Sequence, residues 1–227
     1  MDLVHAVTPS LSGVLGRNLF WMTWNTVLAW IPVGLALLVF RSGRAGKGLP
    51  SSAAWWAGAI LLLLFLPNAP YVVTDLVHLR DDIRLSGNGP VVTTILPVYG
   101  AFIVSGFVAY YLVLAELRRF MEARGLSAWQ TPVLLTVHLL CAIGVFLGRW
   151  VRLNSWEPVV QPRGTFDRMM LALTWEWAPI LIGAVFVATA LGHFVTRAVV
   201  EAGVASARRG ARLIRTVRFA PPSADQA

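Results

Sequence analysis

Residues 53–79 read AAWWAGAILLLLFLPNAPYVVTDLVHL, and this stretch decides how the chain is organised. Its unbroken apolar part, 53–66, has about 14 residues, whereas a helix that crosses a membrane needs about 20. Pro67 and Pro70 follow at once. Proline lacks an amide donor and clashes with the preceding helical turn. The stretch therefore predicts one crossing whose helix is broken inside the membrane.

The two prolines also predict the local backbone at the break. The residue before a proline is crowded out of helical dihedral angles, so we expect Leu66 and Ala69 to leave the helix. Pro67 should leave the carbonyl of Leu63 without its helical donor. We expect a second short helix over about 71–84. Such free carbonyls survive in a membrane only when protein or a watery cavity covers them.

Four other segments are long and apolar enough to cross a membrane, at about 18–40, 91–115, 129–148 and 172–196. Of the 227 residues 57% are hydrophobic and 13% are charged, which excludes a soluble globular domain. The mean hydropathy is +0.67. The sequence therefore predicts an all-α membrane bundle of five transmembrane helices. A re-entrant 53–79 would reduce the count to four and would separate the basic loops, so we prefer five.

The basic residues predict the orientation of the bundle. With five crossings, twelve of the 19 Lys and Arg residues lie on the side of the loops 41–52 and 116–128 and of the tail. The positive-inside rule places that side in the cytoplasm and the N-terminus outside. We expect a multi-pass protein of the bacterial plasma (inner) membrane. The net charge of +8 thus reflects topology, and no nucleic-acid partner is predicted.

The predicted organisation has three parts: a transmembrane bundle over 1–197, a cytoplasmic amphipathic basic helix over 198–219, and a disordered tail over 220–227. The basic helix suits the anionic surface of the cytoplasmic leaflet. The single Cys141 lies inside an apolar run, so no disulfide framework is expected.

Ionisable residues inside a membrane are costly and point to function. Three segments bring such residues to the outer side. The candidate ligand-binding residues are Asn68, Tyr71, Thr74, Asp75 and His78 from the broken segment, Arg149, Arg152 and Asn154 from the end of the fourth span, and Glu176 from the fifth. Their spacing allows Thr74, Asp75 and His78 to share one helical face.

For several polar residues a purely structural role competes with a role in ligand binding. Asp75 with Arg149 or Arg152 fits a buried ion pair that holds helices together. His138 is better explained by a hydrogen bond between helices, and His193 by a position at the interface. Three other charges, Asp81, Asp82 and Arg84, read as a solvated loop. Zinc prefers three or four protein ligands, so no metal and no cofactor are predicted.

Two motifs carry a family resemblance: LPNAPYVVTDLVHL at 66–79 and GRWVRLNSWE at 148–157. With them the chain resembles a family of bacterial polytopic membrane proteins catalogued as domain of unknown function 1361. The resemblance implies no activity. It implies that the following residues belong to the family pattern: Asn68, Pro70, Tyr71, Thr74, Asp75, His78, Arg149, Arg152, Asn154 and Trp156.

Three functions fit these observations. The first is binding or transport of a small polar or anionic ligand, or of a lipid headgroup, in an outer-leaflet pocket, with Arg149 and Arg152 holding the anion and Asp75 orienting His78. The second is a membrane enzyme acting on an outer-leaflet substrate, with His78 as general base and Asp75 fixing its tautomer. The third is a structural or assembly subunit, with a membrane-protein partner or a second copy of itself. In each case the lipid bilayer is the common partner.

Overall fold

The computed structural model describes residues 11–42, 44–85 and 91–218. Within these ranges the chain forms helices and turns and no strand. Five helical stretches are long and apolar enough to cross a membrane: Asn18–Ser42, Ala53–Arg84, Thr93–Ala123, Ser127–Val151 and Ala178–Arg209. The prediction of an all-α bundle with five such helices is confirmed.

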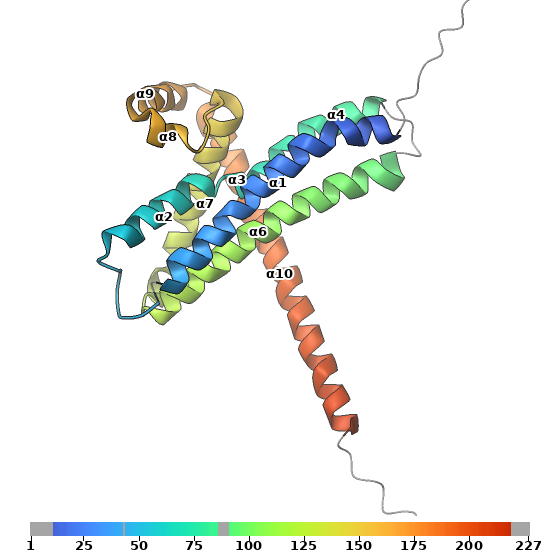
Figure 1. Cartoon of the computed structure of the whole chain (residues 1–227), viewed down its shortest axis with the longest axis vertical. Helices are drawn as coiled ribbons and strands as arrows, with labels where there is room; N and C mark the ends of the chain where they lie inside the picture. Colours follow the sequence, from blue (N-terminus) through green and yellow to red (C-terminus); the bar gives the residue numbers. More distant parts are fainter. Residues whose placement is uncertain (1–10, 43, 86–90, 219–227) are drawn as a thin grey trace, which may run out of the picture.

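The five stretches are built from shorter elements (Figure 1). In chain order these are α1 Leu11–Ser42, α2 Ala53–Phe65, α3 Asn68–Tyr71, the 3₁₀ helix η1 Val72–Asp75, α4 Leu76–Leu85, the π-helix η2 Val91–Ile95, α6 Leu96–Ala123, the 3₁₀ helix η3 Ser127–Trp129, α7 Gln130–Phe146, the π-helix η4 Leu147–Val151, α8 Glu157–Val160, α9 Pro162–Leu173 and α10 Ala178–Arg218.

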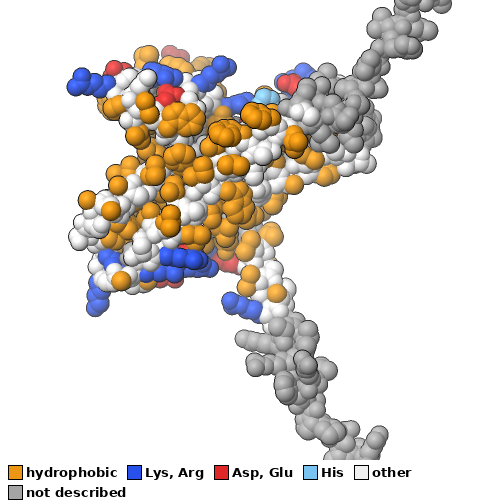
Figure 2. All heavy atoms as spheres, in the orientation of Figure 1, with side chains coloured by type: hydrophobic (Ala, Val, Ile, Leu, Met, Phe, Trp, Pro, Cys, Tyr) orange, Lys and Arg blue, Asp and Glu red, His pale blue; other side chains and the backbone are white. Residues whose placement is uncertain are grey.

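The helices form two groups that cross each other (Figure 1). Helix α1 packs against α2, α3 and α6, while α10 packs against α7 and α6. We call the end where α1 stops, α2 starts and α6 turns into α7 the basic end. The opposite end of α7 carries α8 and α9. In Figure 2, Lys and Arg side chains gather at the basic end and around α8 and α9, with a broad apolar surface between them.

The proline break is present, but its backbone differs from the prediction. Helix α2 ends at Phe65 and α3 starts at Asn68, so the predicted interruption is confirmed. Leu66 nevertheless keeps helical dihedrals (φ −57°, ψ −36°), and its carbonyl accepts a hydrogen bond from the Ala69 amide at 3.1 Å. Leu66 and Ala69 are buried in the core formed with α1 and α6. This packing offsets the crowding before each proline and keeps the chain helical.

Two glycines let α7 approach the break. A Cβ built on Gly144 would clash with Cγ of Pro67, and one on Gly148 would lie 3.3 Å from the ring of Tyr71. The GxxxG spacing of these residues is typical of close helix contacts in membranes. Here the glycines accommodate the proline break rather than a second regular helix.

The basic end is held together by a buried carboxylate. Glu116 on α6 is 5% exposed and pairs with Arg44 at 2.5 Å and Arg119 at 2.6 Å. Nearby, Arg124 donates to the carbonyl of Gly48 at 2.6 Å, and the Gly48 amide donates to the carbonyl of Arg124 at 3.1 Å. These contacts fasten the connection between α1 and α2 to the end of α6.

The predicted basic helix over 198–219 continues the fifth span without a break as far as Arg218, within α10. This part of α10 extends away from the rest of the bundle (Figure 1). Its contact with the cytoplasmic leaflet stays a prediction. The predicted disordered tail, 220–227, lies outside the described residues.

The glycine contact generates a test. Gly144→Ala places a methyl group against Pro67, and such overpacking costs about 1–3 kcal/mol. Gly183→Ala on α10 is the matched control, because nothing lies within 4 Å of a Cβ at that position. Thermal unfolding of the detergent-purified protein should show a lower Tm for Gly144→Ala and an unchanged or higher Tm for Gly183→Ala. Equal Tm values for the two variants would contradict the close contact.

Candidate functional site

Asp75 is the buried charge at the centre of the predicted site, with 2% of its surface exposed. Its Oδ2 accepts a hydrogen bond from Nδ2 of Asn25 at 3.0 Å. Its Oδ1 lies 3.8 Å from Nη1 of Arg149, whose side chain is 25% exposed. The predicted contact with Arg149 is confirmed. The carboxylate thereby joins α1, the 3₁₀ helix η1 and the end of the fourth span.

His78 lies near enough to Asp75 to interact with it electrostatically, but within the described part of the chain the hydrogen bond and the ion pair of Asp75 go to Asn25 and Arg149. His78 is exposed on α4, and its ring lies 5.0 Å from that of Trp21. The prediction of one shared face assumed a regular α-helix. Val72–Asp75 is a 3₁₀ helix instead, and its last residue, Asp75, is buried, whereas His78 in the first turn of α4 is exposed. Thr74 donates to its own helix, to the carbonyl of Tyr71 at 2.8 Å.

A cavity of about 430 Å³ lies between α1, the α2–α3 break, the end of α7 and the segment that follows it. Three predicted site residues line it: Asn68, Tyr71 and Asn154. The other polar or amphipathic lining residues are Trp24, Asn25, Ser155, Trp156 and Thr165, and the apolar lining includes Leu28, Leu63, Leu140 and Ile143. We call this the polar cavity. Its volume is in the range of ligand pockets.

Asn68 connects the two motifs across the polar cavity. Its Nδ2 donates to the carbonyl of Phe65 at 2.8 Å and to Oγ of Ser155 at 2.9 Å. The first bond satisfies a carbonyl that the broken helix leaves open. The second ties the break to the segment after the fourth span. The proline break therefore supplies polar groups to the wall of the polar cavity, as free helix ends do in membrane binding sites.

Arg152 turns the chain at the top of the fourth span. Its φ of +59° lies in the left-handed region, which costs a non-glycine residue roughly 1–2 kcal/mol. The Leu153 amide then donates back to the carbonyl of Leu147 at 3.1 Å, closing the helix end. The Arg152 side chain is exposed and does not line the polar cavity. The backbone turn at Arg152 directs the chain toward α8.

Helices α8 and α9 fill a region for which the sequence predicted no helix. Glu157 accepts hydrogen bonds from the backbone and side-chain nitrogens of Asn154 at 3.0 and 2.7 Å, and pairs with Arg168 at 2.9 Å. The Asn154 hydrogen bonds, with a smaller contribution from Arg168, hold the pKa of the Glu157 carboxyl below its usual range. Large apolar side chains on these helices are exposed, including Val160 and Leu171. Such a surface suits the membrane interface.

Glu176 does not join the site. It is exposed in the turn between α9 and α10 and precedes the fifth span, which begins at Ala178. The predicted site thus separates into three groups. Asn68, Tyr71 and Asn154 line the polar cavity, Asp75 and Arg149 form a buried pair, and Thr74, His78, Arg152 and Glu176 lie outside both.

Sequence reasoning missed Asn25, which lines the polar cavity and also binds Asp75. A lone asparagine in the first apolar span was the available signal. The prediction that Asp82 is solvated is wrong, because Asp82 is 6% exposed. It accepts hydrogen bonds from Nδ2 of Asn18 and from the hydroxyl of Tyr99. The amphipathic pattern of α4 turns this carboxylate toward α1 and α6.

A second polar group lies away from the polar cavity, where α6, α7 and α10 meet. The Tyr110 hydroxyl is 2.8 Å from Nδ1 of His138, which confirms the predicted hydrogen bond between helices. The rings of His138 and His193 lie 5.3 Å apart. His193 is buried within the bundle, and its position at the membrane interface stays a prediction. Among the described residues, no group of three or more His, Cys, Asp and Glu side chains could hold a metal ion.

Comparison with known proteins gives one match. A family described as "Protein of unknown function (DUF1361)" matches residues 24–191, about three quarters of the chain. The matched range includes both motifs and every residue of the polar cavity. No curated protein sequence matches the chain, and no solved structure matches it.

The buried pair can be tested by removing its negative charge. Asp75→Asn leaves the partly buried Arg149 without its counter-ion. Breaking a fully buried pair costs about 3–5 kcal/mol, and the partial exposure of Arg149 makes this an upper limit here. We expect a clearly lower Tm in detergent. Replacing Arg149 by Gln in the same protein should restore part of the loss. Asp167→Asn, the same change at an exposed position of α9, is the control. A Tm for Asp75→Asn equal to that control would show that the pair does not stabilise the bundle.

Proposed function

The chain belongs to the DUF1361 family, whose description assigns no activity, and we propose that this multi-pass membrane protein binds the polar group of a ligand in the polar cavity. One observation carries the proposal. Amide and hydroxyl groups from α1, from the proline break and from the segment after the fourth span converge on one cavity of about 430 Å³. A small number of polar groups that converge in a mostly apolar wall is typical of a ligand site.

The polar lining is uncharged. Asn25, Asn68, Tyr71, Asn154 and Ser155 offer amide and hydroxyl groups, which can donate hydrogen bonds to phosphate or hydroxyl oxygens and accept them in return. This lining favours a small polar ligand or a lipid headgroup recognised by hydrogen bonds. Direct binding of an anionic ligand by Arg149 and Arg152 is not favoured, because neither residue lines the polar cavity.

Asp75 and Arg149 act on this site through Asn25. The carboxylate receives one amide hydrogen of Asn25, and this bond fixes the amide that lines the polar cavity. We therefore assign Asp75 and Arg149 as positioning residues. The alternative of a membrane enzyme needs His78 as a general base in the polar cavity. This alternative is not favoured, because His78 packs on Trp21 and does not line the polar cavity.

The distribution of charge supports an orientation. The arginine-rich connections lie at the basic end, and the C-terminal part of α10 extends away from the bundle on the side opposite to α8 and α9 (Figure 1). The positive-inside rule assigns the side that carries these residues to the cytoplasm. We propose that this end faces the cytoplasm of a plasma membrane. The N-terminus, α8, α9 and the polar cavity then belong to the outer leaflet.

Reporter fusions test this orientation. Fusions at residue 45 and at the C-terminus should report a cytoplasmic location, and a fusion at residue 160 an exterior one. Removing Arg41, Arg44 and Lys47 together should weaken the bias, because these residues form one of the basic loops. A cytoplasmic signal at residue 160 would reverse the proposed leaflet.

Retention of a bound molecule tests the function. The protein is purified in mild detergent and weighed by native mass spectrometry. We expect a bound molecule on the wild type and its loss from Asn68→Ala and Ser155→Ala, because both variants remove groups that line the polar cavity.

The matched control is Thr136→Ala, which removes an exposed hydroxyl on α7 that bonds only the carbonyl of Pro132. It should retain the molecule. If the wild type carries no bound molecule, or if Asn68→Ala, Ser155→Ala and Thr136→Ala all retain it, the polar cavity is not a binding site.

A further inference from the structure

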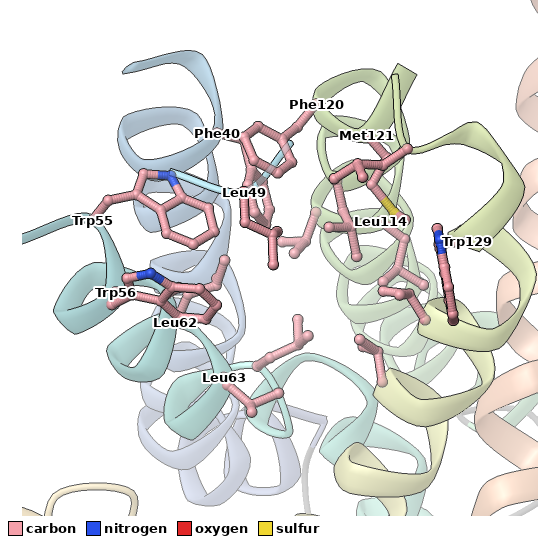
Figure 3. Close-up of a pocket in the computed structure, with 17 residues that line it drawn as sticks. Phe40, Leu49, Trp55, Trp56, Leu62, Leu63, Leu114, Phe120, Met121 and Trp129 are labelled. Atoms are coloured by element: carbon pink, nitrogen blue, oxygen red, sulfur yellow. The ribbon is translucent and has the colours of Figure 1, made fainter. Parts of the chain in front are cut away.

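A second cavity lies toward the basic end and has a volume of about 520 Å³. Figure 3 shows Trp55, Trp56, Leu62 and Leu63 of α2 on one side, with Leu114 and Met121 of α6 and Trp129 on the other. Its lining residues are all hydrophobic. We call it the apolar cavity. A wall of this kind offers no hydrogen bonds to a polar group, so it suits hydrocarbon.

The two cavities lie end to end between the same walls. Leu63 lines both of them. On the α7 side, the apolar cavity is lined by Val133 and Val137, and the polar cavity continues with Leu140 and Ile143. Helix α7 packs mainly on α10, with further contacts to α3 and α6, and it approaches the proline break where Gly144 meets Pro67. Between α2 and α7 the two cavities form a slot along α2.

The slot has the length of a lipid chain. Trp56 lines its basic end and Asn68 its polar end. At 1.5 Å per residue, the twelve residues between them span about 18 Å. One leaflet of the hydrocarbon core, about the length of one lipid chain, is roughly 15 Å deep, half of about 30 Å. Because the slot begins at the basic end, its polar end lies just beyond the middle of the membrane.

We propose that the ligand is a lipid-like amphiphile whose polar group occupies the polar cavity and whose hydrocarbon chain lies along α2 in the apolar cavity. The inference rests on the proposed function and narrows its ligand class. The hydrogen-bonding end and the apolar end of the slot correspond to the two ends of such a molecule. A water-soluble ligand would leave the apolar cavity without an occupant of its own.

Lysophosphatidylglycerol provides the probe, in a form with an oleoyl chain and a form with an octanoyl chain. Glycerophosphoglycerol provides the same headgroup without a chain. Each is added to the detergent-purified protein, and bound molecules are counted by native mass spectrometry. We expect several-fold higher occupancy for the oleoyl form, because only the longer chain makes contacts along the whole slot.

Two tryptophan substitutions on α2 form a matched pair. Ala59 is half-buried and lines the apolar cavity, whereas Ala57 is exposed and lines neither cavity. Ala59→Trp should lower oleoyl-lipid occupancy several-fold, and Ala57→Trp should leave it unchanged. Val137→Trp blocks the slot from the opposite wall and should act like Ala59→Trp. Size-exclusion profiles and helical circular dichroism identify any variant that fails to fold.

The outcomes separate this inference from the proposed function. If Asn68→Ala abolishes binding while chain length and Ala59→Trp have no effect, the polar cavity binds a headgroup or a free polar molecule and the slot inference is wrong. If Ala57→Trp and Ala59→Trp reduce occupancy equally, the chain is held as bulk lipid and the inference is also wrong. If no probe binds and the wild type retains no molecule, the proposed function fails as well.

Discussion

A membrane interior supplies no water to hydrogen-bond with a charged group, so a buried carboxylate must find its partners in the protein. Asp75 meets this constraint with an amide from α1 and a guanidinium from the end of the fourth span. Helix α1, the 3₁₀ helix η1 and η4 are thereby fixed relative to one another. The polar cavity lies beside this junction and shares Asn25 with it. Its geometry therefore depends on a charge that does not touch the cavity itself.

The proline break explains why there is space for a ligand at all. An uninterrupted second helix would satisfy its own backbone and could pack along α7. Pro67 interrupts the ladder, Asn68 caps the open carbonyl, and Gly144 accepts the proline ring. On either side of this contact α2 and α7 line open space instead of each other. A single local irregularity thus produces polar groups at membrane depth and the slot that leads to them.

Apolar runs and prolines were sufficient to predict the five spans, the break and the contact between Asp75 and Arg149. They were not sufficient to predict burial, because Asp75 is buried against α1 and the end of the fourth span, whereas His78, three residues later, is exposed. Pairing across helices was also hidden. Asn25 donates a hydrogen bond to Asp75, 50 positions away in the chain, and the ring of His193 contacts that of His138, 55 positions away. Helices α8 and α9 have only 4 and 12 residues and are too short to cross a membrane, so a search for apolar spans does not mark them.

The order of the residues along the chain bears on how the protein enters the membrane. Chains emerge from the ribosome N-terminal end first. Asn18 and Asn25 therefore reach the translocon before Asp82 and Asp75, to which they bond in the finished fold. Helix α1 thus offers hydrogen-bond donors to the carboxylates of Asp82 and Asp75, which are costly to insert into a membrane alone. Arg149 follows much later, so Asp75 has its amide partner within the first two spans and gains its cationic partner only with the fourth.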